Sequence, residues 1–269
     1  MPAHEDYDAF VFRMLPQQQS SMASHRLGSE RVWLKKAGPR HGPLGYRLLA
    51  VVARVLGLDT LTPVPNPGGE AAIAIEAQRL RRLAELGLRV PHVLAQTPQA
   101  LLISDLGCDG RSAVVFNEWL EQAAARGPEA LLAAWQEGLD AIAVVHAQGA
   151  YLSQAFARNL IHCPDGEVGF IDFEDDPGQT LSIAECQARD WLSYLHSTAL
   201  LLSVSRPEGA GEAWRVALAQ ADPAVRERIA LAARRVRWLR KLPGDRRWGR
   251  DTQRVRAAAQ LLAQWYPDA

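Results

Sequence analysis

The stretch that decides the fold is Ile171–Asp176, with the sequence IDFEDD, together with Arg158–Ile161 (RNLI) upstream of it. Short apolar runs lie on either side of Cys163–Gly166, whose sequence is CPDG. Asp-Gly between two such runs predicts a tight hairpin, because both central positions of a type I′ turn need a positive φ. Asn159 then opens one strand, and Asp172 closes its partner thirteen residues later. We expect the two side chains at the same end of the ribbon, where an amide oxygen and a carboxylate suit a hard cation such as Mg²⁺.

The overall composition is that of a globular protein whose total charge favours no particular partner. The chain has 269 residues, 48% of them hydrophobic, and 30 basic residues balance 30 acidic ones. It is long enough to bury a sizeable core in one or two domains. The acidic N-terminus lacks the apolar centre of a secretory signal, no apolar run is long enough to span a bilayer, and the three cysteines have no metal-ligand spacing. These features predict a cytoplasmic protein, and we do not expect nucleic acid as a partner.

Hydrophobic periodicity changes along the chain from strands to helices. Strand patterns with two helices come first, and helices broken by one hairpin follow. This order predicts an α+β fold with a small strand-rich lobe at residues 1–106 and a larger helical lobe at residues 107–269. The expected helices cover residues 7–15, 44–58, 70–86, 119–124, 131–148, 184–202, 213–219, 223–239 and 250–265. The expected strands cover residues 31–36, 90–94 and 100–104, and the hairpin covers about 159–173. The rest of residues 1–27 is expected to be a loose lead-in.

Lysine is rare in this chain and occurs only at Lys35, Lys36 and Lys241. Two of the three follow Val32–Leu34 directly, at the end of a predicted strand. Lysine carries a compact charge on a flexible stem, which suits point contact with phosphates, whereas arginine is a planar fork. The pair therefore indicates a phosphate contact, with a solvated strand end as the alternative.

Six short segments between about residues 28 and 200 form an ordered set. They are VWLK at 32–35, IEAQRL at 75–80, LLISDLG at 101–107, Asn159, IDF at 171–173 and RDW at 189–191. In order and spacing they resemble the protein-kinase-like superfamily, and within it the bacterial branch that includes the lipopolysaccharide core-sugar kinases, the Kdo kinases. The resemblance implies a two-lobed kinase-like fold that binds ATP and Mg²⁺ and transfers the γ-phosphoryl group to a small-molecule or sugar hydroxyl.

The resemblance also implies which residues bind the nucleotide. Lys35 matches the strand lysine that holds the α- and β-phosphates, and Glu76 matches the helix glutamate that pairs with this lysine. The interval between the two is longer than is usual in the superfamily, and the helix expected at 44–58 fills it as an insertion. The segment that would meet adenine as the hinge is Asp105, Leu106 and Gly107.

A second group of residues matches the metal and acceptor side of the site. Asn159 and Asp172 correspond to the asparagine and aspartate that ligate Mg²⁺, and Glu174 stands where it could bind a second metal or approach the acceptor. Arg158 could neutralise charge on the γ-phosphoryl group or on an anionic substrate. In the RDW segment, the aspartate and tryptophan correspond to buried residues that anchor the catalytic loop.

The chain departs from the family pattern at three places. Gln154 stands where the catalytic aspartate is expected, and an amide cannot accept a proton from a substrate hydroxyl. Glu174 replaces the glycine of Asp-Phe-Gly, and Ser24–Glu30, the place of the glycine-rich loop, contains one glycine. Two functions therefore remain open. One is an atypical phosphotransferase that lacks the usual catalytic aspartate, and the other is a pseudokinase that acts as a nucleotide-binding regulatory or scaffold module.

Arginine dominates between Arg226 and Arg256, and Trp238 and Trp248 lie among these arginines. Such a face can contact anionic lipid headgroups, which would place the protein peripherally on the inner membrane. The alternative is a solvated helix face balanced by acidic segments elsewhere. The acceptor substrate and the oligomeric state cannot be inferred from these patterns.

Overall fold

The computed structural model describes residues 6–39, 68–108 and 110–267. These residues fall into two compact units. The helix expected at 44–58 lies outside the described residues, and the boundary expected between residues 106 and 107 stays a prediction. The first unit holds residues 6–39, 68–113 except 109, and 163–176, and the second holds residues 114–162 and 177–267.

A four-stranded antiparallel sheet forms the centre of the first unit. Its order is β1-β2-β4-β3, with β1 at Met22–Leu27, β2 at Glu30–Lys36, β3 at Val93–Thr97 and β4 at Ala100–Ser104. Strands β2 and β4 were expected at these places. The expected loose lead-in is wrong for β1. This edge strand has one buried residue, Leu27. Its sequence therefore lacks the alternation of apolar and polar residues that identifies a half-buried strand.

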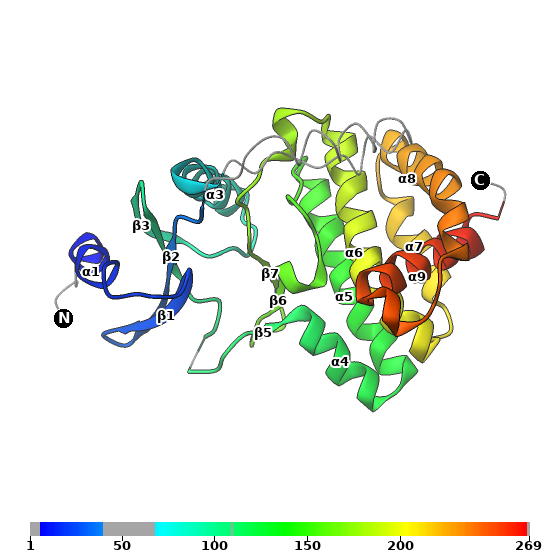
Figure 1. Cartoon of the computed structure of the whole chain (residues 1–269), viewed down its shortest axis with the longest axis horizontal. Helices are drawn as coiled ribbons and strands as arrows, with labels where there is room; N and C mark the ends of the chain where they lie inside the picture. Colours follow the sequence, from blue (N-terminus) through cyan, green and yellow to red (C-terminus); the bar gives the residue numbers. More distant parts are fainter. Residues whose placement is uncertain (1–5, 40–67, 109, 268–269) are drawn as a thin grey trace. The chain divides into compact units, whose positions relative to one another are not determined.

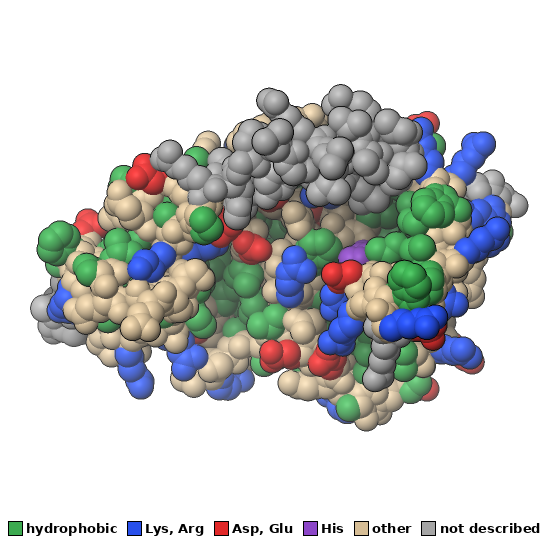
Figure 2. Space-filling view, viewed as in Figure 1, with side chains coloured by type: hydrophobic (Ala, Val, Ile, Leu, Met, Phe, Trp, Pro, Cys, Tyr) green, Lys and Arg blue, Asp and Glu red, His purple; other side chains and the backbone are tan. Residues whose placement is uncertain are grey.

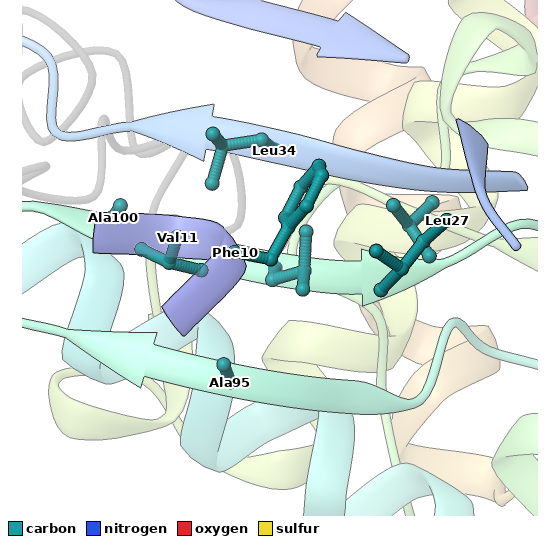
Figure 3. Close-up of a cluster of buried hydrophobic side chains, with 8 residues drawn as sticks. Phe10, Val11, Leu27, Leu34, Ala95 and Ala100 are labelled. Atoms are coloured by element: carbon teal, nitrogen blue, oxygen red, sulfur yellow. The ribbon is translucent and has the colours of Figure 1, made fainter. Parts of the chain in front are cut away.

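Helix α1 (Tyr7–Met14) supplies the hydrophobic core on one face of this sheet. Phe10 and Val11 point from the helix toward Leu27 and Leu34 of the sheet, as Figure 3 shows. The side chain of Asp6 caps the helix by accepting a hydrogen bond from the N–H of Asp8. This packing holds β2, the strand that carries Lys35.

Helix α3 (Gly69–Glu85) was expected at residues 70–86, and the structure confirms it. Its apolar residues recur at helical spacing and are buried: Ile73, Ala77, Leu80 and Leu83. Glu76 lies within this buried stripe. A carboxylate on the apolar face of a helix needs a partner.

The second unit is mainly helical, with a short sheet in which β5 (Val114–Val115) pairs antiparallel with β6 (Leu160–His162). Strand β7 (Val168–Phe170) belongs to the first unit. A small antiparallel sheet unit and a larger helical unit confirm the α+β class (Figure 1). The helices are α4 (Phe116–Arg126), α5 (Pro128–Ala147), α6 (Ile183–Ser205), α7 (Ala210–Ala219), α8 (Pro223–Val236) and α9 (Arg250–Trp265), with short 3₁₀ helices η2 (Ala157–Asn159), η3 (Pro177–Gln179), η4 (Arg237–Lys241) and η5 (Arg246–Trp248).

Large aromatic side chains fill the core of the helical unit. The ring of Trp135 stacks on Tyr194 at 6.1 Å and on Trp214 at 6.5 Å between centroids, and Trp191 meets Trp214 edge-on at 5.9 Å. The Tyr194 hydroxyl donates to the carbonyl oxygen of Trp135 at 2.9 Å, and its burial raises its pKa well above the ordinary value. A Cβ at Gly138 would collide with the Tyr194 hydroxyl, so the glycine permits this close packing.

Across the described helices, none is both long enough and apolar enough to cross a bilayer.

Candidate functional site: a buried lysine among carboxylates

Lys35 and Glu76 form the buried ion pair that the sequence predicts. The Nζ atom of Lys35, on β2, lies 2.6 Å from Oε2 of Glu76, on α3. The two side chains are 13% and 3% exposed, so water screens this contact little. A salt bridge at this depth fixes the ammonium group relative to the strand and the helix.

The pKa of Lys35 reflects these surroundings. Burial alone lowers the pKa of Lys35, but the carboxylates of Glu76 and Glu174 together raise it above its ordinary value. Burial raises the pKa of Glu76 even though the ammonium of Lys35 opposes this shift. Lys35 therefore stays protonated at neutral pH and presents a fixed positive charge.

Asp172 and Glu174, which follow β7, complete the group of carboxylates around Lys35. Oδ1 of Asp172 lies 3.9 Å and Oε1 of Glu174 lies 2.8 Å from the Lys35 Nζ. Between them, Phe173 is 1% exposed, and the Arg79 guanidinium lies 5.6 Å from its ring centroid. The buried ring anchors the segment and leaves both acidic side chains partly exposed, at 47% and 37%.

Asp172 also has an unusual backbone, with φ at 72°. A positive φ is uncommon for a residue other than glycine, and residues held in this way cluster at functional sites. Four of the predicted site residues, Lys35, Glu76, Asp172 and Glu174, therefore meet in one place. Searched over the described parts of the chain, no three His, Cys, Asp or Glu side chains form a metal-holding group.

Arg79 belongs to the same cluster, although sequence reasoning missed it. Its guanidinium lies 3.7 Å from the carboxylate of Asp176, and its side chain is only 9% exposed. It stands three residues after Glu76, on the same face of α3. The available sequence signal was this spacing, which makes Arg79 a neighbour of Glu76 on the helix surface.

The segment expected to act as the hinge has a clear internal structure. The carboxylate of Asp105 accepts hydrogen bonds from the indole N–H of Trp33 at 2.7 Å and from the backbone N–H of Gly107 at 2.8 Å. Leu106 is 7% exposed. A Cβ at Gly107 would lie 2.5 Å from the carbonyl oxygen of Arg111. Asp105 thus shapes the turn after β4, and contact of this turn with adenine stays a prediction.

The remaining predicted residues lie in the helical unit, in and before η2. The Nδ2 atom of Asn159 donates to the carbonyl oxygen of Gln154 at 3.0 Å, and Asn159 is 6% exposed. This bond fixes the amide nitrogen and leaves the amide oxygen as the atom that could ligate a cation. The guanidinium of exposed Arg158 lies 4.4 Å from the centroid of the Phe156 ring.

Asp190, on α6, supports the segment that carries Gln154 and Asn159. It is fully buried, and its Oδ2 atom accepts a hydrogen bond from the N–H of Leu152 at 2.7 Å and lies 3.1 Å from His146 Nε2. The anchoring role implied for the RDW segment is thus seen in its aspartate. The His146 side chain is buried, at 6% exposed, in the core of the helical unit.

The comparisons with known proteins give little help with function. No family model and no curated protein matches this chain. Among solved structures, the choline kinase LicA from Streptococcus pneumoniae is similar with 13% sequence identity over 96% of this chain and 98% of that chain, at a TM-score of 0.37. A likeness at this level assigns neither an activity nor a substrate to this chain.

Proposed function

We propose that the protein binds ATP with Mg²⁺ as kinase-like enzymes do and transfers the γ-phosphoryl group to the hydroxyl of a small molecule or sugar. The observation that supports this most is the buried Lys35–Glu76 ion pair with Asp172 beside the same ammonium group. In protein kinases a strand lysine paired with a helix glutamate binds the phosphates, and the aspartate of Asp-Phe-Gly holds the metal.

In this proposal each residue around the ammonium group has a separate task. Lys35 contacts the α- and β-phosphates, and Glu76 keeps it in position. Asp172 offers a partly exposed carboxylate, and Asn159 offers its amide oxygen, which are donors that Mg²⁺ accepts. Bound Mg²⁺ would neutralise charge on the phosphates.

Asn159 and Asp172 are thirteen residues apart in the sequence. A tight turn separates the two residues: the N–H of Cys163 donates to the carbonyl oxygen of Glu167 at 2.9 Å, and Gly166 has φ at 89°. Of the two central residues expected to have a positive φ, only Gly166 has one and Asp165 does not, so the turn is not the type I′ turn that the sequence predicts. The shared metal site itself remains part of the proposal.

Glu174 sets a condition on nucleotide binding. Its carboxylate contacts Lys35 at 2.8 Å, which is where a phosphate oxygen would bind in the proposed complex. A nucleotide must therefore displace this carboxylate, and its binding is weaker by the free energy of that contact. Once displaced, the partly exposed Glu174 is free to approach a second cation or the acceptor.

The alternative function is a pseudokinase that binds nucleotide without phosphoryl transfer. In the segment that would carry the catalytic base, the Leu152 N–H donates to Asp190 and the Asn159 side chain donates to the carbonyl oxygen of Gln154. Its side chain at Gln154 is nevertheless an amide, which cannot act as a general base. Phosphoryl transfer relies mainly on positioning and charge neutralisation, so an enzyme without this base would be slow and not necessarily silent.

Nucleotide binding can be tested by thermal unfolding with ATP and Mg²⁺. Wild type should unfold at a higher temperature with the nucleotide, because a ligand that binds only the folded state stabilises it. Lys35→Met should lose this shift, and the control Lys241→Met, which changes an exposed lysine, should keep it. The proposal fails if wild type shows no shift or if Lys35→Met shows the full shift.

Turnover separates the two candidate functions. Wild type and Gln154→Asp are incubated with ATP, Mg²⁺ and a panel of sugars and amino alcohols, and ADP release is measured. Release by wild type supports the phosphotransferase. Release by Gln154→Asp alone supports the pseudokinase, because the restored carboxylate then supplies the missing base.

A further inference from the structure

Two adjoining cavities in the helical unit differ in chemical character. The larger has a volume of about 640 Å³ and is lined by charged as well as apolar side chains, and the smaller, of about 280 Å³, is lined mainly by apolar side chains. Phe156 and His196 line both, so the two spaces meet at these rings, whose centroids are 6.0 Å apart. Their combined size is that of a small-molecule site.

Three arginines give the larger cavity its charge. Arg158 comes from η2, and Arg250 and Arg254 come from the first turns of α9. Two carboxylates also line it, Glu121 and Asp251, and Asp251 lies 3.2 Å from the Arg254 guanidinium. The arginines therefore outnumber the acids, and arginine forks bind phosphate or carboxylate oxygens in pairs.

His196, at the boundary, adds no positive charge of its own. Burial lowers its pKa, and so do the guanidinium groups of Arg254 and Arg158, although Asp251 opposes them. Its ring is therefore neutral at pH 7 and forms, with Phe156, an uncharged passage from the basic cavity to the apolar one.

The smaller cavity lies among α6, α8 and α9. Small side chains leave the space open: Ala232 on α8, and Ala258 and Ala259 on α9 are all at most 9% exposed. Leu192 and Leu262 supply further apolar wall. Figure 2 shows hydrophobic and basic side chains next to one another over the helices α8 and α9.

We propose that these two cavities together bind a small molecule with an anionic head and an apolar chain, such as an alkyl phosphate. The head lies against Arg158, Arg250 and Arg254, and the chain passes Phe156 and His196 into the alanine-lined space. Charge complementarity selects the head, and the apolar lining selects the chain. This inference does not depend on the proposed nucleotide site, and it is tested on the full chain without nucleotide.

The first test measures binding of n-octyl phosphate by isothermal titration, below the concentration at which it forms micelles. Octyl phosphate should bind more tightly than butyl phosphate by about fourfold for each additional buried methylene. Inorganic phosphate should bind weakly, and octyltrimethylammonium, which has the same chain and the opposite charge, should not bind. Equal affinity for the octyl and butyl esters, or binding of the cation, would overturn the proposal.

The second test uses variants in each cavity. Arg254→Gln should weaken octyl phosphate binding about tenfold, because a charge-assisted contact is lost. Ala258→Leu fills the apolar cavity and should weaken octyl phosphate but not inorganic phosphate. The matched control is Arg215→Gln, an exposed arginine on α7 paired with Glu212, and it should bind as wild type does.

Two further outcomes are decisive. If Ala258→Leu does not fold, as thermal unfolding would show, the chain-length series still decides whether the alkyl group is bound. If the protein binds phosphatidylglycerol vesicles but no monomeric octyl phosphate, the arginines serve a membrane surface and the proposed small-molecule site is wrong.

Discussion

At the scale of single residues, two carboxylates contact the Lys35 ammonium group closely, although one would be enough to hold it in place. Glu76 at 2.6 Å is buried and rigid, while Glu174 at 2.8 Å is partly exposed and follows the anchored Phe173. The two contacts therefore have different consequences. In the proposed function, Glu76 holds the ammonium group in position, and Glu174 would compete with the phosphate for Lys35.

This competition predicts that Glu174→Gln binds MgATP more tightly than wild type. The variant removes the negative charge but keeps the shape, so the nucleotide displaces a weaker contact. The expected gain is about fivefold, which corresponds to about 1 kcal/mol. Isothermal titration measures it, with the exposed Glu227→Gln as control. Unchanged or weaker binding by Glu174→Gln would show that this carboxylate does not occupy the phosphate position.

Lys35 also stabilises the folded protein, because its ammonium group neutralises the buried carboxylate of Glu76. In Lys35→Met the Glu76 carboxylate stays buried without its cation, which costs about 3 kcal/mol of unfolding free energy at pH 7. Its pKa then rises further above the ordinary value of 4.5, because burial is no longer opposed by the ammonium. A buried acid with a raised pKa destabilises the folded state above its unfolded pKa, so the loss should shrink as pH falls toward 4.5.

Urea unfolding at pH 5 and pH 8 measures this effect. The control is Lys35→Met combined with Glu76→Gln, which removes the buried charge and should lose the pH dependence. A loss of stability in Lys35→Met that is the same at both pH values would contradict the account.

At the scale of elements, periodicity predicted the helices well and the edge of the sheet poorly. Helices α3 and α9 were expected within a residue of their observed bounds, because each has a regular apolar stripe. Strand β3 begins at Val93 and not at Val90, with an irregular register between Val93 and Ala95. Strand β1 has one buried residue, so its sequence shows no alternation of apolar and polar residues. Hydrogen bonding to a neighbour defines such strands, and it is not visible in the sequence.

Helix α6 anchors the segment before η2 through side chains that include Asp190 and Gln187, which gives a prediction at this scale. Asp190→Ala leaves the Leu152 N–H buried without its acceptor and opens a cavity, so it should lower the unfolding free energy by about 3 kcal/mol. Chemical denaturation measures this, with exposed Asp140→Asn on α5 as control. A loss below 1 kcal/mol would mean that Asp190 does not hold the segment.

At the scale of the whole molecule, the predicted site residues divide between the two units. Lys35, Glu76, Asp172 and Glu174 meet in the sheet unit, and Gln154, Arg158 and Asn159 belong to the helical unit. The resemblance singled out these residues by their order and type, and their roles stay predictions. The contact of Glu174 with Lys35 was not foreseen, because it joins side chains 139 positions apart and depends on how Phe173 packs.

The proposed function predicts that nucleotide binding needs the metal as well as the lysine. With ATP alone the Asp172 carboxylate repels the phosphates, so the thermal shift should be small, and adding Mg²⁺ should enlarge it. Asp172→Asn removes both the repulsion and the metal ligand, so its shift with ATP should not change when Mg²⁺ is added. A full shift with ATP in the presence of a chelator would remove the metal role given to Asp172.

The most direct measurement is a crystal structure of the full chain with a non-hydrolysable ATP analogue and Mg²⁺. The account predicts phosphate oxygens within hydrogen-bond distance of the Lys35 Nζ, the Glu76 contact intact, the Glu174 carboxylate displaced, and the metal on Asp172. An analogue bound elsewhere, with Glu174 still against Lys35, would contradict it.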